Sequence, residues 1–263
     1  MSDQALGGKV GVVTGGNQGI GLAIAQAMAN AGASLAICAR TAESLERASQ
    51  QISGLGVECL PLQCDVSDPA SADAMAKSVL DHFGRVDVVV ANAGIAGAIR
   101  PMHEITYEEW RECIATDLDG VYLTFRRFIP SIIESTRGGS LIAVSSMTGK
   151  RPLPERTPYS AAKMGVLGLV RSLALELGPH QIRVNSVCPG AVAGPRLDRI
   201  VKQQAEALGI TEAESMRRFS DPAALKRPTR ADEVAAACVF LGSDASSGIT
   251  GEDMNVSAGL VMY

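Results

Sequence analysis

A tyrosine and a lysine four residues apart could do acid–base chemistry: Tyr159 and Lys163, in TPYSAAK. In a helix this spacing places both side chains on one face, one turn apart. A tyrosine hydroxyl can give a proton to an oxygen that gains charge, and a nearby ammonium group favours the phenolate that takes the proton back. An ordinary amphipathic helix with a lysine stem packed on the ring has the same spacing, so the rest of the chain must decide.

A serine lies upstream of this pair, at the end of an apolar run. Ser146 closes SLIAVSS (140–146), thirteen residues before Tyr159. A strand that ends at Ser146 and a helix that begins near Tyr159 would bring both hydroxyls to the carboxyl edge of a sheet. In general, a hydroxyl that hydrogen-bonds to an oxygen gaining negative charge stabilises it by about 2–4 kcal/mol in oxyanion sites.

The turn after the first apolar run is rich in glycine. In TGGNQGIG the spacing is T-G-x-x-x-G-x-G, which permits a tight turn, close approach of a pyrophosphate and close packing of the next helix. The free N–H groups and positive dipole end of that helix attract the anion. Any strand-to-helix turn can use glycines, but this one opens the first helix and so predicts a dinucleotide site. The residues expected to line it are Gly15, Asn17, Gln18, Gly19, Ile20 and Gly21.

The end of the second strand would meet the adenosine ribose. An acid there favours the 2′-hydroxyl of NAD, whereas an arginine favours the 2′-phosphate of NADP. The chain has Arg40 there and no acid before Glu43, and a guanidinium can make a forked contact to phosphate. Gln18 adds no second positive charge. We therefore expect NADP(H) to be preferred and NAD(H) to be possible; the alternative is that Arg40 is a solvated charge at a strand end.

Asp65 ends the third strand in QCDVSD and is followed by Val66. Its carboxylate could accept a hydrogen bond from the adenine amino group, with Val66 in the same cofactor site. The alternative is an acid that caps the following turn or helix.

Short apolar runs alternate with longer helical patterns along nearly the whole chain. This alternation predicts right-handed β-α-β crossovers and a parallel sheet covered by helices on both faces. No repeat, low-complexity tract or linker interrupts residues 1–263. The predicted fold is therefore α/β, a single-domain doubly wound Rossmann fold. The expected strands are 9–15, 34–40, 57–66, 85–94, 140–146 and 182–190, and the expected helices include 19–32, 41–56, 67–84 and 106–135.

Residues 191–228 break this rhythm, because they are helical but polar and are interrupted by Gly and Pro. In a doubly wound sheet an excursion after a late strand lies over the carboxyl ends, where ligands bind. We expect a helical substrate lid, and a plain surface insertion of helices is the alternative.

The composition excludes several classes of function. Of 263 residues, 46% are hydrophobic and 20% are charged, and the formal net charge is −4. This acidic balance does not provide the basic surface that binding to nucleic acid or to an anionic membrane requires. No apolar run reaches the length of about 18 residues that a membrane span needs, and the amino-terminal stretch does not read as a signal peptide. The scattered cysteines and histidines indicate neither a metal site nor disulfides and fit a cytoplasmic protein.

Several motifs, in order along the chain, resemble the classical short-chain dehydrogenase/reductase (SDR) family. They are TGGNQGIG at 14–21, ANAG at 91–94, the serine in SSMTG, YSAAK at 159–163 and NSVCPG at 185–190, and the likeness extends to GITGEDMNVSAG at 248–259. The resemblance implies an NAD(P)(H)-dependent oxidoreductase that interconverts a secondary alcohol and a ketone, or an alcohol and an aldehyde. Tyr159 would be the general acid and base, assisted by Lys163 and Ser146.

The same resemblance implies further contacts and partners. Family members are commonly tetramers, so we expect a homotetramer that takes a small carbonyl or alcohol substrate and binds neither nucleic acid nor membrane. Residues 95–102, 147–154 and 191–228 would line the substrate pocket. The further cofactor contacts expected are Asn92, Ala93, Gly94, Tyr159, Lys163, Pro189, Gly190 and Val192.

Two positions depart from the family pattern. Asp117, in IATDLDGVYL, stands where the family has an asparagine that completes a proton relay through a bound water. An amide donates and accepts, whereas an ionised carboxylate only accepts. The relay is therefore rearranged, or Asp117 is protonated, or its part is structural; Asp117 stays a catalytic candidate. Gly194 stands where the family often has a threonine that contacts the nicotinamide amide, so the backbone at Val192 or a lid residue would take that part.

Two other functions stay open. A 3-oxoacyl-carrier-protein-type reductase needs a basic surface for an acidic carrier, and residues 191–228 do carry arginines and lysines, interleaved with acids. A non-catalytic dinucleotide-binding redox sensor would have no need of a phenolate, so the intact Tyr159–Lys163 pair speaks against it.

Overall fold

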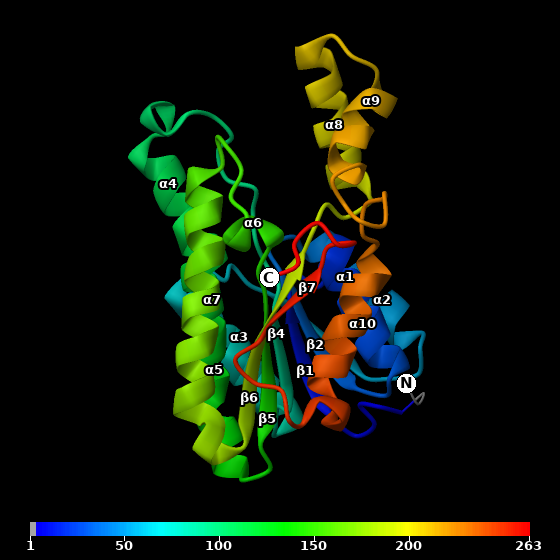
Figure 1. Ribbon diagram of the computed structural model, residues 1–263. Coiled ribbons are helices and arrows are strands. Elements are labelled where there is room, and N and C mark those ends of the chain that lie inside the picture. Colours follow the sequence, from blue (N-terminus) through cyan, green and yellow to red (C-terminus); the bar gives the residue numbers. More distant parts are fainter. Residues whose placement is uncertain (1–3) are drawn as a thin grey trace.

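The chain forms a seven-stranded β-sheet in the order β3-β2-β1-β4-β5-β6-β7 (Figure 1). The computed structural model describes residues 4–263, so residues 1–3 of the expected domain lie outside it. All neighbouring strands are parallel, and the order reverses between β1 and β4, as in a doubly wound sheet. The predicted α/β Rossmann-type fold is confirmed. The strands are β1 (Val10–Thr14), β2 (Ser34–Ala39), β3 (Cys59–Gln63), β4 (Val88–Ala91), β5 (Gly139–Val144), β6 (Ile182–Pro189) and β7 (Asp253–Val256).

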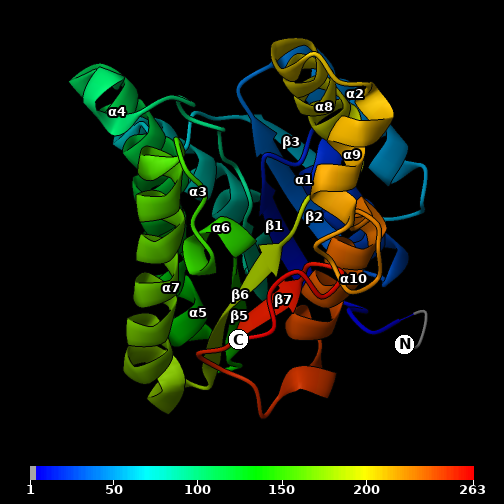
Figure 2. The same cartoon turned by 45° about the horizontal axis from the view of Figure 1, so that its top comes forward.

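Helices cover both faces of this sheet (Figures 1 and 2). Successive strand residues point to opposite faces, so Val13 packs in one hydrophobic core and Val12 in the other. Both faces are buried, which explains why the strands read as apolar runs. One face carries α1 (Gly19–Asn30), α2 (Ala42–Ser53) and α10 (Ala231–Gly242), and the other carries α3 (Pro69–Phe83), α5 (Gly120–Ser135) and α7 (Thr157–Leu177).

All six predicted strands are present, each shorter than predicted. The largest differences are at the predicted strands 57–66 and 85–94, of which only Cys59–Gln63 (β3) and Val88–Ala91 (β4) form strands. The edge strand β7 was not predicted as a strand, since DMNV is short and mixes polar and apolar residues.

The helix predicted over 106–135 contains an irregularity at its centre. Thr106 begins α4 (Tyr107–Ile114) with a capping box that includes Glu109. A π-helical turn, Ala115–Asp119, then leads into α5. Such turns widen the backbone locally and are frequent at functional sites. This one carries Asp117.

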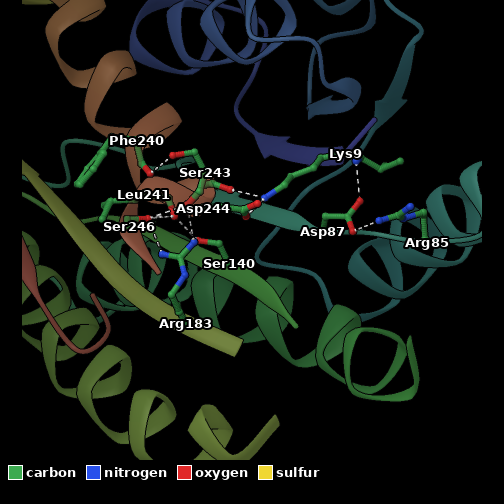
Figure 3. A network of polar contacts seen from close by, with 12 residues as sticks. Lys9, Arg85, Asp87, Ser140, Arg183, Phe240, Leu241, Ser243, Asp244 and Ser246 are labelled. Carbon is green, nitrogen blue, oxygen red and sulfur yellow. Dashed lines mark hydrogen bonds and ion pairs between the residues drawn. The ribbon is translucent and has the colours of Figure 1, made fainter. Parts of the chain in front are cut away.

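A polar network ties the amino edge of the sheet to the end of α10 (Figure 3). Lys9 donates a hydrogen bond to the Gly242 carbonyl at 3.3 Å and pairs with Asp244 at 2.7 Å. Arg183, in β6, donates to the Ser243 carbonyl at 3.1 Å. These cations meet the negative end of the helix, so Lys9 and Arg183, which line a hollow of about 470 Å³ at this edge, already have partners. The network is structural, and the predicted site residues lie at the opposite edge.

The segment between β6 and α10 stands over the carboxyl edge of the sheet (Figures 1 and 2). It forms α8 (Pro195–Leu208) and α9 (Glu212–Ser220), within the predicted range 191–228. Leu197, Val201 and Ala205 are buried along α8. No helix in residues 4–263 combines the length and apolarity needed to cross a membrane.

Candidate active site

Three of the four catalytic candidates come from two segments that pack together at the carboxyl edge. Ser146 follows β5 and caps the short helix α6 (Met147–Lys150), where its hydroxyl accepts a hydrogen bond from the Thr148 amide at 3.1 Å. Tyr159 and Lys163 lie in the first two turns of α7. The Lys163 Nζ is 5.6 Å from the centroid of the Tyr159 ring. The four-residue spacing therefore does place the ammonium beside the phenol.

Lys163 is held firmly, because its side chain is only 4% exposed and has several partners. Its Nζ donates a hydrogen bond to the Val144 carbonyl at 3.1 Å, and its own backbone carbonyl accepts one from the Ser145 hydroxyl at 2.9 Å. These bonds fasten α7 to the end of β5. Ser145 was not singled out from the sequence, although it is the first serine of SSMTG.

Asp117 is fully buried, and its Oδ1 lies 3.7 Å from the Lys163 Nζ. The Ile95 amide donates to the same oxygen at 2.9 Å, and the Cys113 thiol donates to Oδ2 at 3.5 Å. Burial raises the pKa of Asp117 above its ordinary value, while the Lys163 charge, the Ile95 amide and the Cys113 thiol act in the opposite direction. Asp117 therefore contacts Lys163 directly, and its part in catalysis stays a prediction.

Two neighbours of this cluster were missed from the sequence. Cys113 lies four residues before Asp117, and burial together with the Asp117 charge raises the pKa of its thiol to about 12, so the thiol stays protonated and can donate. Arg156 directly precedes α7, and its guanidinium carbon lies 4.7 Å from the centroid of the Tyr159 ring. The sequence did contain signals for both residues. Cys113 is spaced i, i+4 from Asp117, and Arg156 stands immediately before the TPY that contains Tyr159.

The glycine turn has the shape that a pyrophosphate requires. Gly15 and Gly19 have positive φ of 64° and 56°, which glycine adopts without strain. A Cβ on Gly21 would lie 2.0 Å from the Gly15 carbonyl oxygen, whereas one on Gly19 would meet nothing within 4 Å. Gln18 makes no side-chain cap to α1, and the first turn of α1 has no acid. Amides at this helix start can therefore bind an anion, and the residues present fit a dinucleotide.

Thr14 and Asn92 lock β1 to β4 beneath this turn. The Thr14 hydroxyl accepts hydrogen bonds from the amides of Asn92 and Ala93, both at 3.0 Å. The Asn92 side chain donates in return to the Thr14 carbonyl at 2.9 Å. Gly94 follows, and a Cβ on it would lie 2.4 Å from Asp117 Oδ1. Thr14 was not among the predicted site residues, although it opens the TGGNQGIG motif.

The two strand ends expected near adenosine differ in how free their side chains are. Arg40 is exposed, and only its backbone carbonyl is engaged, by the Gln63 side chain at 2.9 Å. Asp65 Oδ1 accepts from the Ser67 hydroxyl at 2.6 Å and from the Ser67 amide at 3.0 Å. These bonds lower the pKa of Asp65, and the Arg40 charge lowers it further. Oδ1 of Asp65 thus caps the turn at Ser67, which was the alternative interpretation of this residue. The contact of Asp65 with adenine stays a prediction.

The remaining cofactor candidates lie around the same edge. Asn17 donates to the Ser44 hydroxyl at 2.8 Å. Gly190 follows β6 and donates its amide to the Val256 carbonyl at 3.0 Å. Val192 pairs with Thr229 in an isolated parallel bridge. Gln18, Ile20 and Val66 flank the glycine turn and the end of β3, and Pro189 ends β6. Within residues 4–263, no group of three or more His, Cys, Asp or Glu side chains could hold a metal ion.

Comparison with known proteins identifies this arrangement. Residues 14–261 match a family model described as enoyl-(acyl carrier protein) reductase. The D-threitol dehydrogenase of Mycolicibacterium smegmatis is 34% identical over 98% of this chain and 94% of its own. The short chain dehydrogenase/reductase AstE of Aspergillus oryzae is 35% identical over 97% of this chain and 96% of its own.

Solved structures agree in fold across the whole length. Carveol dehydrogenase from Mycobacterium avium, solved with NAD, has a TM-score of 0.90 at 30% identity and covers 98% of this chain and 99% of its own. Actinorhodin polyketide ketoreductase, solved with NADPH, has a TM-score of 0.92 at 31% identity and covers 97% of this chain and 98% of its own.

The fold and these likenesses define an oxidoreductase with a Rossmann-type sheet. More closely, the chain belongs to the short-chain dehydrogenase/reductase family, as its motifs led us to expect.

Proposed function

We propose that this chain catalyses the NAD(P)(H)-dependent interconversion of a secondary alcohol and a ketone, or of an alcohol and an aldehyde. The observation that carries the proposal is the buried Lys163 ammonium beside the Tyr159 ring, with Ser146 on the adjoining segment. A buried ammonium is costly unless it has partners or a task. Here the Lys163 ammonium lies beside the phenol ring of Tyr159, at the carboxyl edge of the sheet, where doubly wound folds bind their ligands.

Each of the three side chains has one part in the reaction. In reduction the Tyr159 hydroxyl gives its proton to the substrate oxygen, and in oxidation the phenolate removes the proton from the alcohol. The Lys163 charge stabilises that phenolate. The Ser146 hydroxyl, held at the cap of α6, donates a hydrogen bond to the substrate oxygen as its negative charge grows. Bound nicotinamide supplies or accepts the hydride.

The cofactor would be held along the carboxyl edge. The glycine turn Gly15–Gly21 and the start of α1 would bind the pyrophosphate, Asn92 to Gly94 would line the cleft, and Lys163 would hold the nicotinamide ribose. The carveol dehydrogenase was solved with NAD and the polyketide ketoreductase with NADPH. The similarity of this chain to both supports a nicotinamide dinucleotide as cofactor and does not favour NAD over NADP. We propose NADP(H), because the exposed Arg40 side chain has no bond to a carboxylate among the ion pairs of residues 4–263 and can fork onto a 2′-phosphate.

Residues 191–228 would act as a lid on one catalytic domain, 1–263. In support, α8 and α9 stand over the edge that carries Tyr159 (Figure 2). We also propose a cytoplasmic homotetramer, since all six cysteines are free thiols and the carboxyl-terminal residues Met262 and Tyr263 are largely exposed apolar groups.

The deciding experiment follows NADPH and NADH oxidation over ketones, aldehydes, sugars and 3-oxoacyl thioesters. Wild-type turnover that nearly disappears in Tyr159→Phe, with cofactor binding retained, would support the proposal. Cofactor binding without turnover on any substrate would favour the redox sensor instead.

A 3-oxoacyl-carrier-protein-type reductase is the second candidate. The likeness to the polyketide ketoreductase favours it. Preference for a carrier-bound thioester over the free ketones in the same assay would establish it.

A further inference from the structure

Arg156 combines two features: its guanidinium lies on an aromatic ring, and its Nε is covered without a partner. Its guanidinium stacks on the Tyr159 ring at 4.7 Å, and its Nε is inaccessible to solvent without a hydrogen-bond partner. Stacking on an aromatic face offsets part of the cost of this burial. It does not satisfy the N–H groups of the fork, which are donors without any acceptor of their own.

Arg196 brings a second positive charge to the same place. It lies in the first turn of α8, the helix that stands over the carboxyl edge. Burial lowers the pKa of Arg156, and repulsion by Arg196 lowers it further. Arg196 therefore lies close enough for its charge to act on Arg156.

Acidic partners do not balance these two charges. Neither arginine belongs to an ion pair within residues 4–263, whereas nearby Arg100 pairs with Glu109. The carboxylate that both sense is Asp117, which is buried and already contacts Lys163. A solvated basic face would account for Arg196 alone. It does not account for a covered arginine against the proposed catalytic ring.

We propose that the substrate carries an oxyanion, a carboxylate or a phosphate, close to its reacting carbon, and that Arg156 and Arg196 bind this group. This inference rests on the proposed function, because it assumes that the carbonyl oxygen lies at Tyr159 and Ser146. A planar fork suits either anion, since it can donate two parallel hydrogen bonds. Binding the anion there would also fix the orientation of the carbonyl.

The test compares matched pairs of substrates. The first pair is 3-oxobutanoate and its methyl ester; the second is a phosphorylated hydroxyketone and the same ketone without phosphate. Wild type should turn over at least one anion with a higher kcat/KM than its neutral partner. Arg156→Met should lower kcat/KM for that anion about 10- to 100-fold, mainly through KM, because a hydrogen bond to a charged group is lost. The neutral partner should lose much less, so the ratio of the two kcat/KM values should fall toward one in this variant.

Three variants make the result specific. Arg156→Lys keeps the charge without the fork and should fall between wild type and Arg156→Met. Arg196→Met should repeat the effect more weakly. Arg137→Met is the control, because Arg137 is also an exposed arginine but precedes β5 at the opposite edge of the sheet. Melting temperatures of all variants check that they fold.

The outcomes separate this inference from the proposed function. Equal losses on anionic and neutral substrates would mean that Arg156 is structural, and a rise in the KM of the cofactor would mean that Arg196 serves the cofactor; either result overturns the inference. Protection against thermal unfolding by acetate or inorganic phosphate gives a readout without turnover. If no carbonyl is turned over, the proposed function fails. Even then, thermal protection by the anion that Arg156→Met abolishes would support the anion site. If neither acetate nor phosphate protects the wild type, the anion site is overturned.

Discussion

The Lys163 Nζ lies 3.7 Å from the Asp117 Oδ1, and both side chains are buried. At this position the family pattern has an amide, which cannot carry charge. A carboxylate can, so the positive field that Lys163 exerts on Tyr159 depends on whether Asp117 is ionised. We therefore expect the activity of the site to depend on the ionisation of Asp117.

We expect Asp117→Asn to shift the pH profile of alcohol oxidation. In wild type, ionised Asp117 offsets part of the Lys163 charge, and the phenolate of Tyr159 is less favoured. The asparagine variant leaves the full ammonium charge, so the acid limb of the rate profile should move to lower pH by about one unit. Initial rates of oxidation between pH 5 and about pH 10 measure this. Superimposable profiles would show that Asp117 is protonated throughout or acts only structurally.

The same substitution should change stability with a definite sign. The pKa of Asp117 is raised in the folded protein, so the folded state holds this proton more tightly than the unfolded chain does. Wild type therefore loses stability as pH rises above the unfolded value of about 3.9 and through the folded pKa. Asp117→Asn removes that loss. Urea unfolding should find the variant more stable than wild type at pH 8, with a smaller difference at pH 5; a difference that grows toward low pH would contradict the sign.

Gly94→Ala should displace the Asp117 carboxylate from Lys163 without changing either of these two residues. A Cβ at Gly94 would lie 2.4 Å from Asp117 Oδ1 and 3.4 Å from Lys163 Nζ. The carboxylate must move, and both kcat and stability should fall, the latter by about 1–3 kcal/mol. Gly168→Ala on α7 is the control, because a Cβ there meets nothing within 4 Å and alanine favours a helix. Wild-type kcat in Gly94→Ala would refute this account.

The sequence predicted the architecture well because each strand and helix depends on its own local pattern. The runs around Val12 and Val13 indicate a strand buried on both faces whatever lies next to it. The proximity of Tyr159 and Lys163 follows from helix periodicity alone. Gly21 was predictable in the same way, since its motif encodes a turn that leaves no room for a Cβ.

Contacts between distant segments could not be read in this way. Thr14 accepts hydrogen bonds from residues 78 and 79 positions further on, and only the pairing of β1 with β4 brings them together. The π-helical turn at Asp117 has no simple sequence signature, so the contacts of this side chain with Ile95 and Cys113 were not foreseen. The stacking of Arg156 depends on how the segment between α6 and α7 packs.

Arg40 gives a prediction for cofactor choice. Its side chain is exposed at the end of β2, where it can reach a 2′-phosphate. Arg40→Ala should raise the KM for NADPH about 10- to 100-fold and leave the KM for NADH unchanged. Arg47→Ala is the control, since Arg47 pairs with Glu43 on the exposed side of α2. If wild type already prefers NADH, or if Arg40→Ala affects both cofactors alike, then Arg40 is a solvated strand-end charge.

Thr14 gives a prediction for the scaffold beneath the site. Its hydroxyl, in a side chain that is 1% exposed, is the acceptor for the amides of Asn92 and Ala93. Thr14→Val keeps the shape but leaves two buried amides without that acceptor, at a cost on the order of 2–4 kcal/mol. Thr14→Ser keeps the hydroxyl and should lose far less. Urea unfolding of the three proteins measures the difference, and dinucleotide affinity should fall in the valine variant because Asn92 no longer holds the glycine turn firmly. Equal destabilisation by valine and serine would mean that the lost methyl packing, and not the hydroxyl, governs this position.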